Sequence, residues 1–314
     1  MPLEALGFVD LPPHVGAGGF DHAAVHEATG LVYVAHTAND AVDVFDIERR
    51  AYVGSIPGVK AVAGALVSES TLFTSNRGDH TVGIFTLGQL SPTLVSTGHR
   101  PNGLAYDPGR ERLLAAHVGD PAIPGSCTVS IIDVATRRRI ADLAVPGRTR
   151  WTVFDPVADL FHVNIMDPAQ IVVVRAGDPI EIVRIIAIPA GGPHGLDIDV
   201  KRRRLYCACD AGQLVELDAD SGAVLSTAAL AGPPDVIFLH AEGDRLYVAI
   251  GDPGVIEVFA TSPLALTETV RTEPGAHTLA FDASRDLVCA FLPQSHRAAI
   301  YRDSGRAGQA RPAA

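Results

Sequence analysis

Histidine is the residue type in this sequence whose spacing first suggests a shared chemical site. The chain has 12 histidines, and imidazole is both an acid or base near neutral pH and the most common protein ligand for metals. Three of them, His22, His26 and His36, fall in the segment from Gly18 to Glu48, which otherwise has the composition of β-strands. What they can do depends on where those strands place them.

The sequence repeats a pattern of short apolar strands with a period of about 40 residues. Segments such as "GLVYVAHTANDAVDVFDIE", "STLFTSNRGDHTVGIFTLG" and "DRLYVAIGDPGVIEVFATS" each contain a strand, a turn rich in Gly, Asn or Asp, and an alternating second strand. Another strand precedes each segment and a fourth follows most of them. This period is typical of a four-stranded propeller blade, and seven units fit the chain.

The seventh unit stops after its third strand, near residues 301–303. The N-terminal stretch "LEALGFVDLPP" resembles the fourth strands of the other units and can complete the seventh. We therefore predict an all-β, seven-bladed propeller of four-stranded antiparallel blades, as one domain over residues 1–303. Residues 3–12 would form the outer strand of blade 7 and close the ring. We expect residues 304–314 to be a disordered polar tail.

Three of these repeats resemble the YVTN/YncE-type, or lactonase-like, seven-bladed propellers. They are "YVAHTANDAVDVFD" at 33–46, "LFTSNRGDHTVGIF" at 72–85 and "LYVAIGDPGVIEVF" at 246–259. The literal Tyr-Val-Thr-Asn is absent, and Tyr-Val-Ala-His stands in its place in blade 1. The resemblance implies the fold over almost the whole chain. Related propellers serve as lactonases, lyases, ligand-binding modules or scaffolds, so the function must be argued from the site.

The first strand of each blade should line the central channel, and its start should lie on the face that also carries the turns between strands 2 and 3. We call this the top face. The strand starts form an unusually polar row: Asp21 (or His22), Ala63, Asn102, Arg150, His194, Asp235 and His277. His36 and His117 end second strands on the same face. The sequence therefore predicts that His22, His36, His117, His194 and His277 gather around one opening.

The opposite ends of the first strands predict plain turn capping. Asp107, Asp155, Asp199 and Asp282 open these turns, and a short carboxylate readily accepts hydrogen bonds from turn backbone. His26 and His240 take the same position, so we expect them to be structural.

Convergent imidazoles at the top would suit a divalent metal such as Zn, Fe, Ni or Cu, with Mn and Ca also open. Asp235 would serve as a carboxylate ligand or base, while Arg150 and Asn102 would orient an oxyanion or carboxylate. The alternative is that these polar side chains only bind water and turn backbone at a wet rim. No compact metal motif is present, although ligands from separate blades would not form one.

Further candidates flank the strand starts. Arg100 and Lys60 could hold a carboxylate or phosphate, or be solvated loop charges. Trp151 could be a stacking wall for a ligand or a wedge between blades. His296 is a second-tier candidate near the same face.

Composition limits the possible partners. The formal net charge is -11 and no basic face is visible, which argues against nucleic-acid binding. Four cysteines are too few for a disulfide scaffold in a chain of this length. Because the sequence shows neither a secretion signal nor an apolar span, we expect a cytoplasmic protein, without a membrane partner, that works as a monomer.

The sequence thus favours an enzyme that acts on a small and possibly anionic molecule. A metal-assisted hydrolase or lyase for an ester, lactone or organic acid fits the predicted residues best. The alternative is a non-catalytic propeller that binds a ligand or a protein at the same face.

Overall fold

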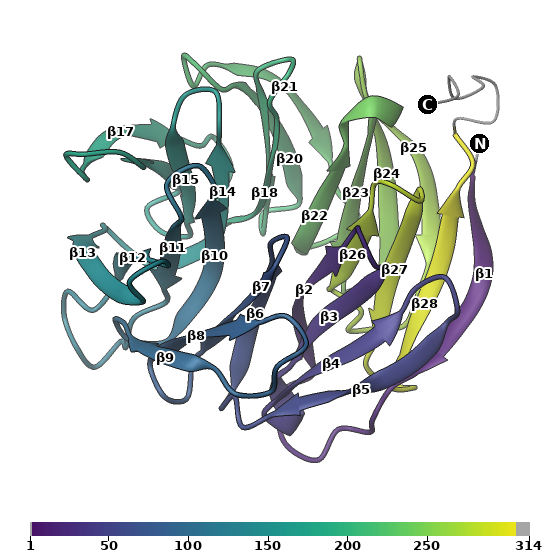
Figure 1. Cartoon of the computed structure of the whole chain (residues 1–314). Helices are drawn as coiled ribbons and strands as arrows, with labels where there is room; N and C mark the ends of the chain where they lie inside the picture. Colours follow the sequence, from purple (N-terminus) through teal and green to yellow (C-terminus); the bar gives the residue numbers. More distant parts are fainter. Residues whose placement is uncertain (1, 306–314) are drawn as a thin grey trace, which may run out of the picture.

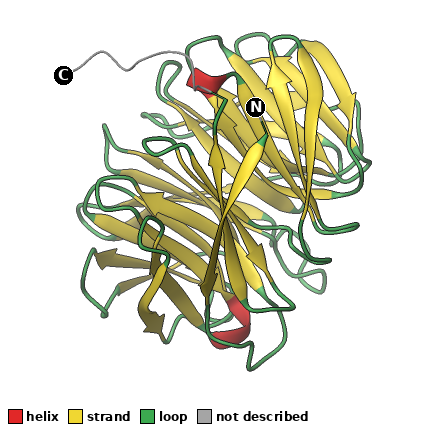
Figure 2. Cartoon of the chain, turned by 90° about the vertical axis from the view of Figure 1, so that its right-hand side faces the viewer, coloured by secondary structure: helices red, strands yellow, loops and turns green. Residues whose placement is uncertain are grey.

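The computed structural model describes residues 2–305, which form seven four-stranded sheets arranged around a central axis (Figure 1). All paired strands within the sheets are antiparallel, for example β10 with β11. The predicted seven-bladed fold is therefore confirmed. Only two short 3-10 turns interrupt the strands and loops of the described part, η1 (Thr37–Asn39) and η2 (Ala241–Gly243) (Figure 2). Among the described residues, no helix is long and apolar enough to cross a membrane.

The first strands of neighbouring blades contact one another and form the innermost ring. They are β2 (Phe20–His26), β6 (Val62–Val67), β10 (Pro101–Asp107), β14 (Thr149–Asp155), β18 (Pro193–Asp199), β22 (Pro234–His240) and β26 (Leu279–Asp282). The second strands are β3 (Leu31–His36), β7 (Thr71–Asn76), β11 (Arg112–His117), β15 (Leu160–Ile165), β19 (Arg204–Cys209), β23 (Arg245–Ile250) and β27 (Leu287–Leu292).

The remaining strands follow outwards. The third strands are β4 (Ala41–Asp46), β8 (Thr81–Thr86), β12 (Thr128–Asp133), β16 (Gln170–Arg175), β20 (Gln213–Asp218), β24 (Val255–Thr261) and β28 (Arg297–Asp303). The outer strands are β5 (Ala51–Pro57), β9 (Thr93–Ser96), β13 (Arg138–Ala144), β17 (Ile182–Ala187), β21 (Val224–Ala229), β25 (Leu264–Arg271) and β1 (Leu3–Asp10).

Strand β1 closes the ring, as the sequence predicts. It pairs with β28 from Leu3 opposite Asp303 to Asp10 opposite Arg297, so the two ends of the propeller belong to one sheet (Figure 1). This pairing covers the free edge of β28 and joins sequence-distant parts of the ring. Apart from residues 304 and 305, the expected disordered tail lies outside the described residues.

The hydrophobic core lies between the blades rather than within one of them. One cluster joins Ile171 and Val173 of β16 to Leu205 and Val215 of the next blade. The second and third strands are buried on both faces, whereas outer strands such as β21 alternate between exposed and half-buried side chains. This pattern explains why the inner strands have continuous Val- and Ile-rich sequences.

The bottom turns between first and second strands are capped by aspartates. Asp107 Oδ1 accepts hydrogen bonds from the backbone N–H groups of Gly109 and Arg110, and Asp155, Asp199 and Asp282 cap their turns in the same way. His26 takes this place in blade 1, where its Nδ1 lies 2.8 Å from Thr29 Oγ1. The structural role expected of these turn residues is confirmed for His26.

Candidate functional site

The register of the first strands resolves the ambiguity in blade 1. Phe20 pairs with His36 and Ala23 with Val34, so a bulge separates the two pairs. The same irregularity follows Pro101 in blade 3 and Thr149 in blade 4. Asp21 therefore occupies the position of Asn102 and Arg150 at the rim of the channel. His22 lies one position deeper, equivalent to Trp151.

His194 is the centre of a charged cluster at the top of the channel, which we call the mouth cluster. Its Nδ1 lies 2.8 Å from Oδ1 of Asp210, in the turn after β19. Its Nε2 lies 3.0 Å from Oδ1 of Asp235, the second residue of β22. One imidazole thus lies between two carboxylates that come from blades 5 and 6.

The Nε2 atom of His194 has a second neighbour of opposite character. Arg150 Nη1 lies 3.1 Å away, and its Nη2 lies 3.5 Å from Asp210 Oδ2. Nε2 can accept a hydrogen bond from Arg150 only when the ring is neutral, and can donate towards Asp235 only when it carries a proton. Asp235 Oδ1 is buried and accepts no well-aligned hydrogen bond among the described residues. The cluster therefore has two competing hydrogen-bond arrangements that differ by one proton.

The carboxylates decide the charge of this imidazole. Burial lowers the pKa of His194, but Asp235 and Asp210 outweigh burial and the opposing charge of Arg150 and raise this pKa to about 9. Burial raises the pKa of Asp235, but His194 and His277 outweigh it and hold the pKa well below its usual value. Near neutral pH we therefore expect an imidazolium between two carboxylates.

His277 is the accessible member of the mouth cluster. Its side chain is 39% exposed, and its Nε2 lies 3.8 Å from Asp235 Oδ2. Its Nδ1 lies 2.7 Å from the carbonyl oxygen of Gly275. Because a carbonyl only accepts, Nδ1 carries the proton of the neutral ring and Nε2 is left with a lone pair. That lone pair is available to take a proton from a bound molecule.

A hollow of about 420 Å³ is lined by Arg150, His194, Asp210, Asp235 and His277, together with Pro233, Pro234, Gly251 and Asp252. Its size suits a small molecule. Positive charge also gathers nearby. Burial is the main cause that lowers the pKa of Arg148, and the positive charges of Arg150, Arg77 and Arg100 lower it further. These four guanidiniums therefore repel one another across the top face. An anion placed among them would relieve that repulsion.

A second polar network continues the rim through blades 1 to 3. Arg77, in the turn after β7, donates a hydrogen bond to Asn102 Oδ1, and its Nη2 lies 3.3 Å from Asp21 Oδ2. Asp21 Oδ1 lies 3.3 Å from Nε2 of His22. Burial lowers the pKa of His22 although Asp21 and Asp235 oppose it. Asn102 therefore positions Arg77 and does not line the mouth hollow.

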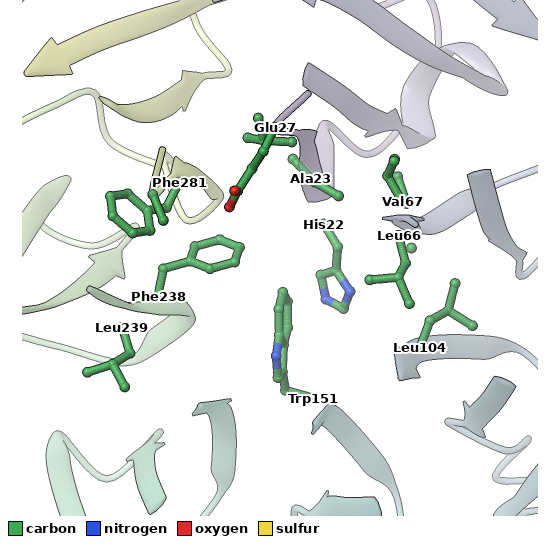
Figure 3. Close-up of a pocket in the computed structure, with 15 residues that line it drawn as sticks. His22, Ala23, Glu27, Leu66, Val67, Leu104, Trp151, Phe238, Leu239 and Phe281 are labelled. Carbon is green, nitrogen blue, oxygen red and sulfur yellow. The ribbon is translucent and has the colours of Figure 1, made fainter. Parts of the chain in front are cut away.

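His22 and Trp151 meet one position deeper in the channel than the mouth cluster. Their ring centroids are 4.2 Å apart although they come from blades 1 and 4, and Figure 3 shows the two rings side by side. At the equivalent position of blade 3, a Cβ on Gly103 would lie 2.5 Å from the carbonyl oxygen of Arg150. The neighbouring first strands β10 and β14 therefore approach closely at the level of the two rings. Trp151 faces a lower hollow and not the mouth, which corrects its predicted place.

The prediction that His36 and His117 join the other histidines at the opening is wrong. His36 is fully buried, with Nδ1 2.6 Å from Asp43 Oδ2 and Nε2 2.7 Å from His14 Nδ1. His117 Nδ1 lies 2.7 Å from Thr128 Oγ1, and burial first, then Arg139, lowers its pKa to about 3. Both end second strands, one strand spacing of about 4.8 Å further from the axis, and pack between blades.

Three predicted substrate-binding residues also lie away from the mouth hollow. Arg100 lines a separate hollow of about 280 Å³ beside Arg148. Lys60 is exposed and lies 3.5 Å from Asp79 Oδ1. His296 packs edge-on against His14, with ring centroids 4.5 Å apart. Each of these residues lies in a link or turn between strands. The strand register alone does not reveal the direction of a side chain in such a segment.

The predicted metal site was tested against the donor geometry. No group of three or more His, Cys, Asp or Glu side chains in residues 2–305 is arranged to hold a metal ion. Both ring nitrogens of His194 already face carboxylates. The divalent metal stays a prediction.

Two members of the site were not among the predicted site residues. Asp210 follows β19 on the top face. Its position in a turn between strands 2 and 3 was the sequence feature that could have indicated a place at the mouth. Arg77 occupies the corresponding turn of blade 2, directly after Asn76. Its reach to Asp21 and Asn102 depends on a long side chain crossing two blades, for which the sequence carries no signal.

The fold has many structural neighbours. The chain matches no protein-family model and no curated protein by sequence. Among the solved structures that match is a chain of hydrazine synthase from Kuenenia stuttgartiensis, with a TM-score of 0.80 and 11% sequence identity, over 93% of this chain and 98% of that one. The chain is a seven-bladed β-propeller. At this identity the likeness shows the fold alone, and the resemblance to the YVTN/YncE family is not confirmed.

Proposed function

We propose that the mouth cluster binds a small anionic or carbonyl-bearing molecule and catalyses acid–base cleavage, with hydrolysis of an ester or lactone as the reaction. The observation that carries this proposal is the convergence of His194, Asp235, Arg150 and His277 on one hollow of about 420 Å³. The hollow thus combines the cation of Arg150, which can hold an oxyanion, the carboxylate of Asp235, and the exposed imidazole of His277 with its free lone pair.

In the proposed reaction, His277 Nε2 takes a proton from a water molecule as the water oxygen attacks the carbonyl carbon. Arg150 stabilises the negative charge that develops on the carbonyl oxygen. The His194 imidazolium adds its positive charge nearby, while its two N–H groups face Asp210 and Asp235. Asp235, 3.8 Å from His277 Nε2, stabilises the second imidazolium while it lasts. The tetrahedral intermediate then expels the alcohol oxygen, which takes the proton back from His277.

The test is hydrolysis of a panel of short-chain esters and five- or six-membered lactones. We expect the wild-type protein to turn over at least one of them, and His277→Ala to lower the rate about 10²- to 10⁴-fold. His26→Gln is the matched control, because His26 lies in a bottom turn, and it should leave the rate unchanged. Absence of turnover across the panel, or equal rates for His277→Ala and wild type, would contradict the proposal.

Non-catalytic binding of a small organic acid is the second candidate. It is favoured by one observation: the two cations of the cluster, His194 and Arg150, balance the two carboxylates of Asp210 and Asp235, so the site is stable without a ligand. Saturable binding of the lactone-derived hydroxy acids, without turnover of any ester or lactone, would select this candidate. Loss of that binding in Arg150→Ala would place it at the mouth.

A further inference from the structure

The part of the channel below the His22–Trp151 contact is a large space that the proposed reaction does not use. Two adjoining hollows, of about 330 Å³ and 1030 Å³, share Leu66, Val67, Leu104, Trp151 and Phe238 as lining residues. We call their union the lower hollow. His22 and Trp151 line its inner end, and residues of the turns between first and second strands, such as Pro108 and Glu111, line its outer part.

The walls of the lower hollow are apolar and aromatic. Trp151 and Phe238 pack edge to face with ring centroids 6.2 Å apart, and Phe281 lines the same space. Leu66 and Leu104 lie on the opposite side of the hollow in Figure 3. A space of this size with such walls can bury an alkyl chain, and aromatic faces also attract cations.

The charges that line the lower hollow are all negative. Its lining includes the carboxylates of Glu27, Glu69, Glu111 and Asp197, and no lysine or arginine is among the lining residues. The Glu27 side chain points into the space near Phe281 in Figure 3. The neighbouring Arg285 does not line the hollow: its Nη1 donates to the carbonyl oxygen of Glu27 and lies 3.0 Å from Asp282 Oδ2, and its Nε lies 3.0 Å from Glu48 Oε2.

We propose that the lower hollow binds a cationic amphiphile, that is, an alkyl chain that carries a quaternary or protonated amine. The alkyl chain packs against Leu66, Leu104 and Trp151, and the ammonium group lies at the opening near Glu69 and Glu111. Charge complementarity selects this class of ligand, because an anionic amphiphile of equal length meets only carboxylates there. This site is separate from the mouth cluster and does not depend on its proposed chemistry.

The experiment uses the fluorescence of Trp151, which is the only tryptophan of the sequence and lies at the inner end of the hollow. Decyltrimethylammonium, decanol and decyl sulfate are titrated into the full chain below the concentrations at which micelles form. We expect a saturable change in emission with decyltrimethylammonium, and affinity about tenfold or more lower for decyl sulfate. Equal affinities for the three probes, or no saturable change, would overturn the proposal.

Two variants separate charge from packing. The double variant Glu69→Gln/Glu111→Gln changes only exposed side chains, so the fold should be retained. It should weaken decyltrimethylammonium about tenfold and leave decanol unchanged. Phe238→Ala should weaken both probes, and Leu94→Ala, on an exposed face of β9, should weaken neither. An unchanged preference for the cation in the double variant would also overturn the proposal.

Discussion

The mouth cluster and the lower hollow are chemically opposite although neighbouring residues build them. Arg150 lines the mouth, whereas the next residue, Trp151, lines the lower hollow. In blade 1, Asp21 forms an ion pair with Arg77 at the rim, and His22 contacts Trp151 below it. One step along the first strands thus changes a charged environment into an aromatic one. The comparison teaches that this propeller separates two sites by single residues, so single substitutions can address either site.

Among the substitutions that test the contrast between the two sites, the largest effect should come from His194→Ala, which removes the cation between Asp210 and Asp235. We expect turnover at the mouth to fall about 10²- to 10³-fold, because the oxyanion loses a nearby positive charge and Asp210 and Asp235 lose the cation between them. Binding of decyltrimethylammonium should not change, because the mouth hollow and the lower hollow share no lining residue. Parallel rate and fluorescence measurements on one preparation test both statements, and a weakened amphiphile would show that the sites are coupled.

Trp151→Ala should come next, because it removes one ring of the His22–Trp151 contact. Trp151 is half-buried and packs on His22 and Phe238, so we expect the free energy of unfolding to fall by about 2–3 kcal/mol. Trp151→Phe should retain most of it. Urea unfolding followed by circular dichroism measures both values. Equal losses in the two variants would mean that ring packing across the channel does not stabilise the fold.

Stability should also depend on pH through one group at each of the two sites. The His194 pKa is raised to about 9 from an ordinary value of 6.5, so its contribution of about 3 kcal/mol is fully present below pH 6.5 and is lost as pH rises to about 9. Burial raises the Asp197 pKa to about 6, against hydrogen bonds from the backbone of Leu239 and Ile198. For Asp197, stability falls between about pH 4 and pH 6.

Urea unfolding across this pH range measures both dependences. His194→Gln should flatten the alkaline part of the curve and leave the acid part unchanged, while Asp197→Asn should do the reverse. A wild-type slope that persists between pH 6.5 and 9 in His194→Gln would assign that dependence to other groups.

The smallest effect should be that of Lys60→Ala, which changes a residue predicted from the sequence to bind substrate. The Lys60–Asp79 pair is exposed, with side chains 66% and 37% accessible, and such pairs contribute less than about 0.5 kcal/mol. We expect neither the stability nor the turnover at the mouth to change measurably. A clear loss of turnover would extend the site beyond the mouth cluster.

Much of the fold was predictable because each blade repeats the same pattern of strands and turns in the sequence. Alternating strands, aspartate-capped turns such as Asp107, and a missing fourth strand in blade 7 were enough to predict seven blades and the role of β1. The row of strand starts also predicted His194, Asp235 and Arg150 together at the mouth. These features depend on the spacing of apolar and turn residues along the chain, which sets where each strand begins and ends.

The rest of the site depends on distance from the axis and on side-chain reach. His36 and His117 end strands on the correct face, but they lie one strand further out and find partners in the third strands of their own blades, Asp43 and Thr128. Arg77 reaches the rim from a neighbouring blade. Sequence periodicity gives the position of a residue along a strand, but it does not give the direction in which a buried polar side chain finds its partner.

The charge of His194 is the most direct test, because both the oxyanion role of the mouth and its contrast with the lower hollow depend on it. Ring-nitrogen NMR shifts of 15N-histidine-labelled protein, assigned by comparison with His194→Gln, follow its protonation from pH 5 to 10. We predict an imidazolium that persists through neutral pH and titrates near pH 9. A neutral ring at pH 7.5, with one nitrogen that carries no proton, would contradict the account.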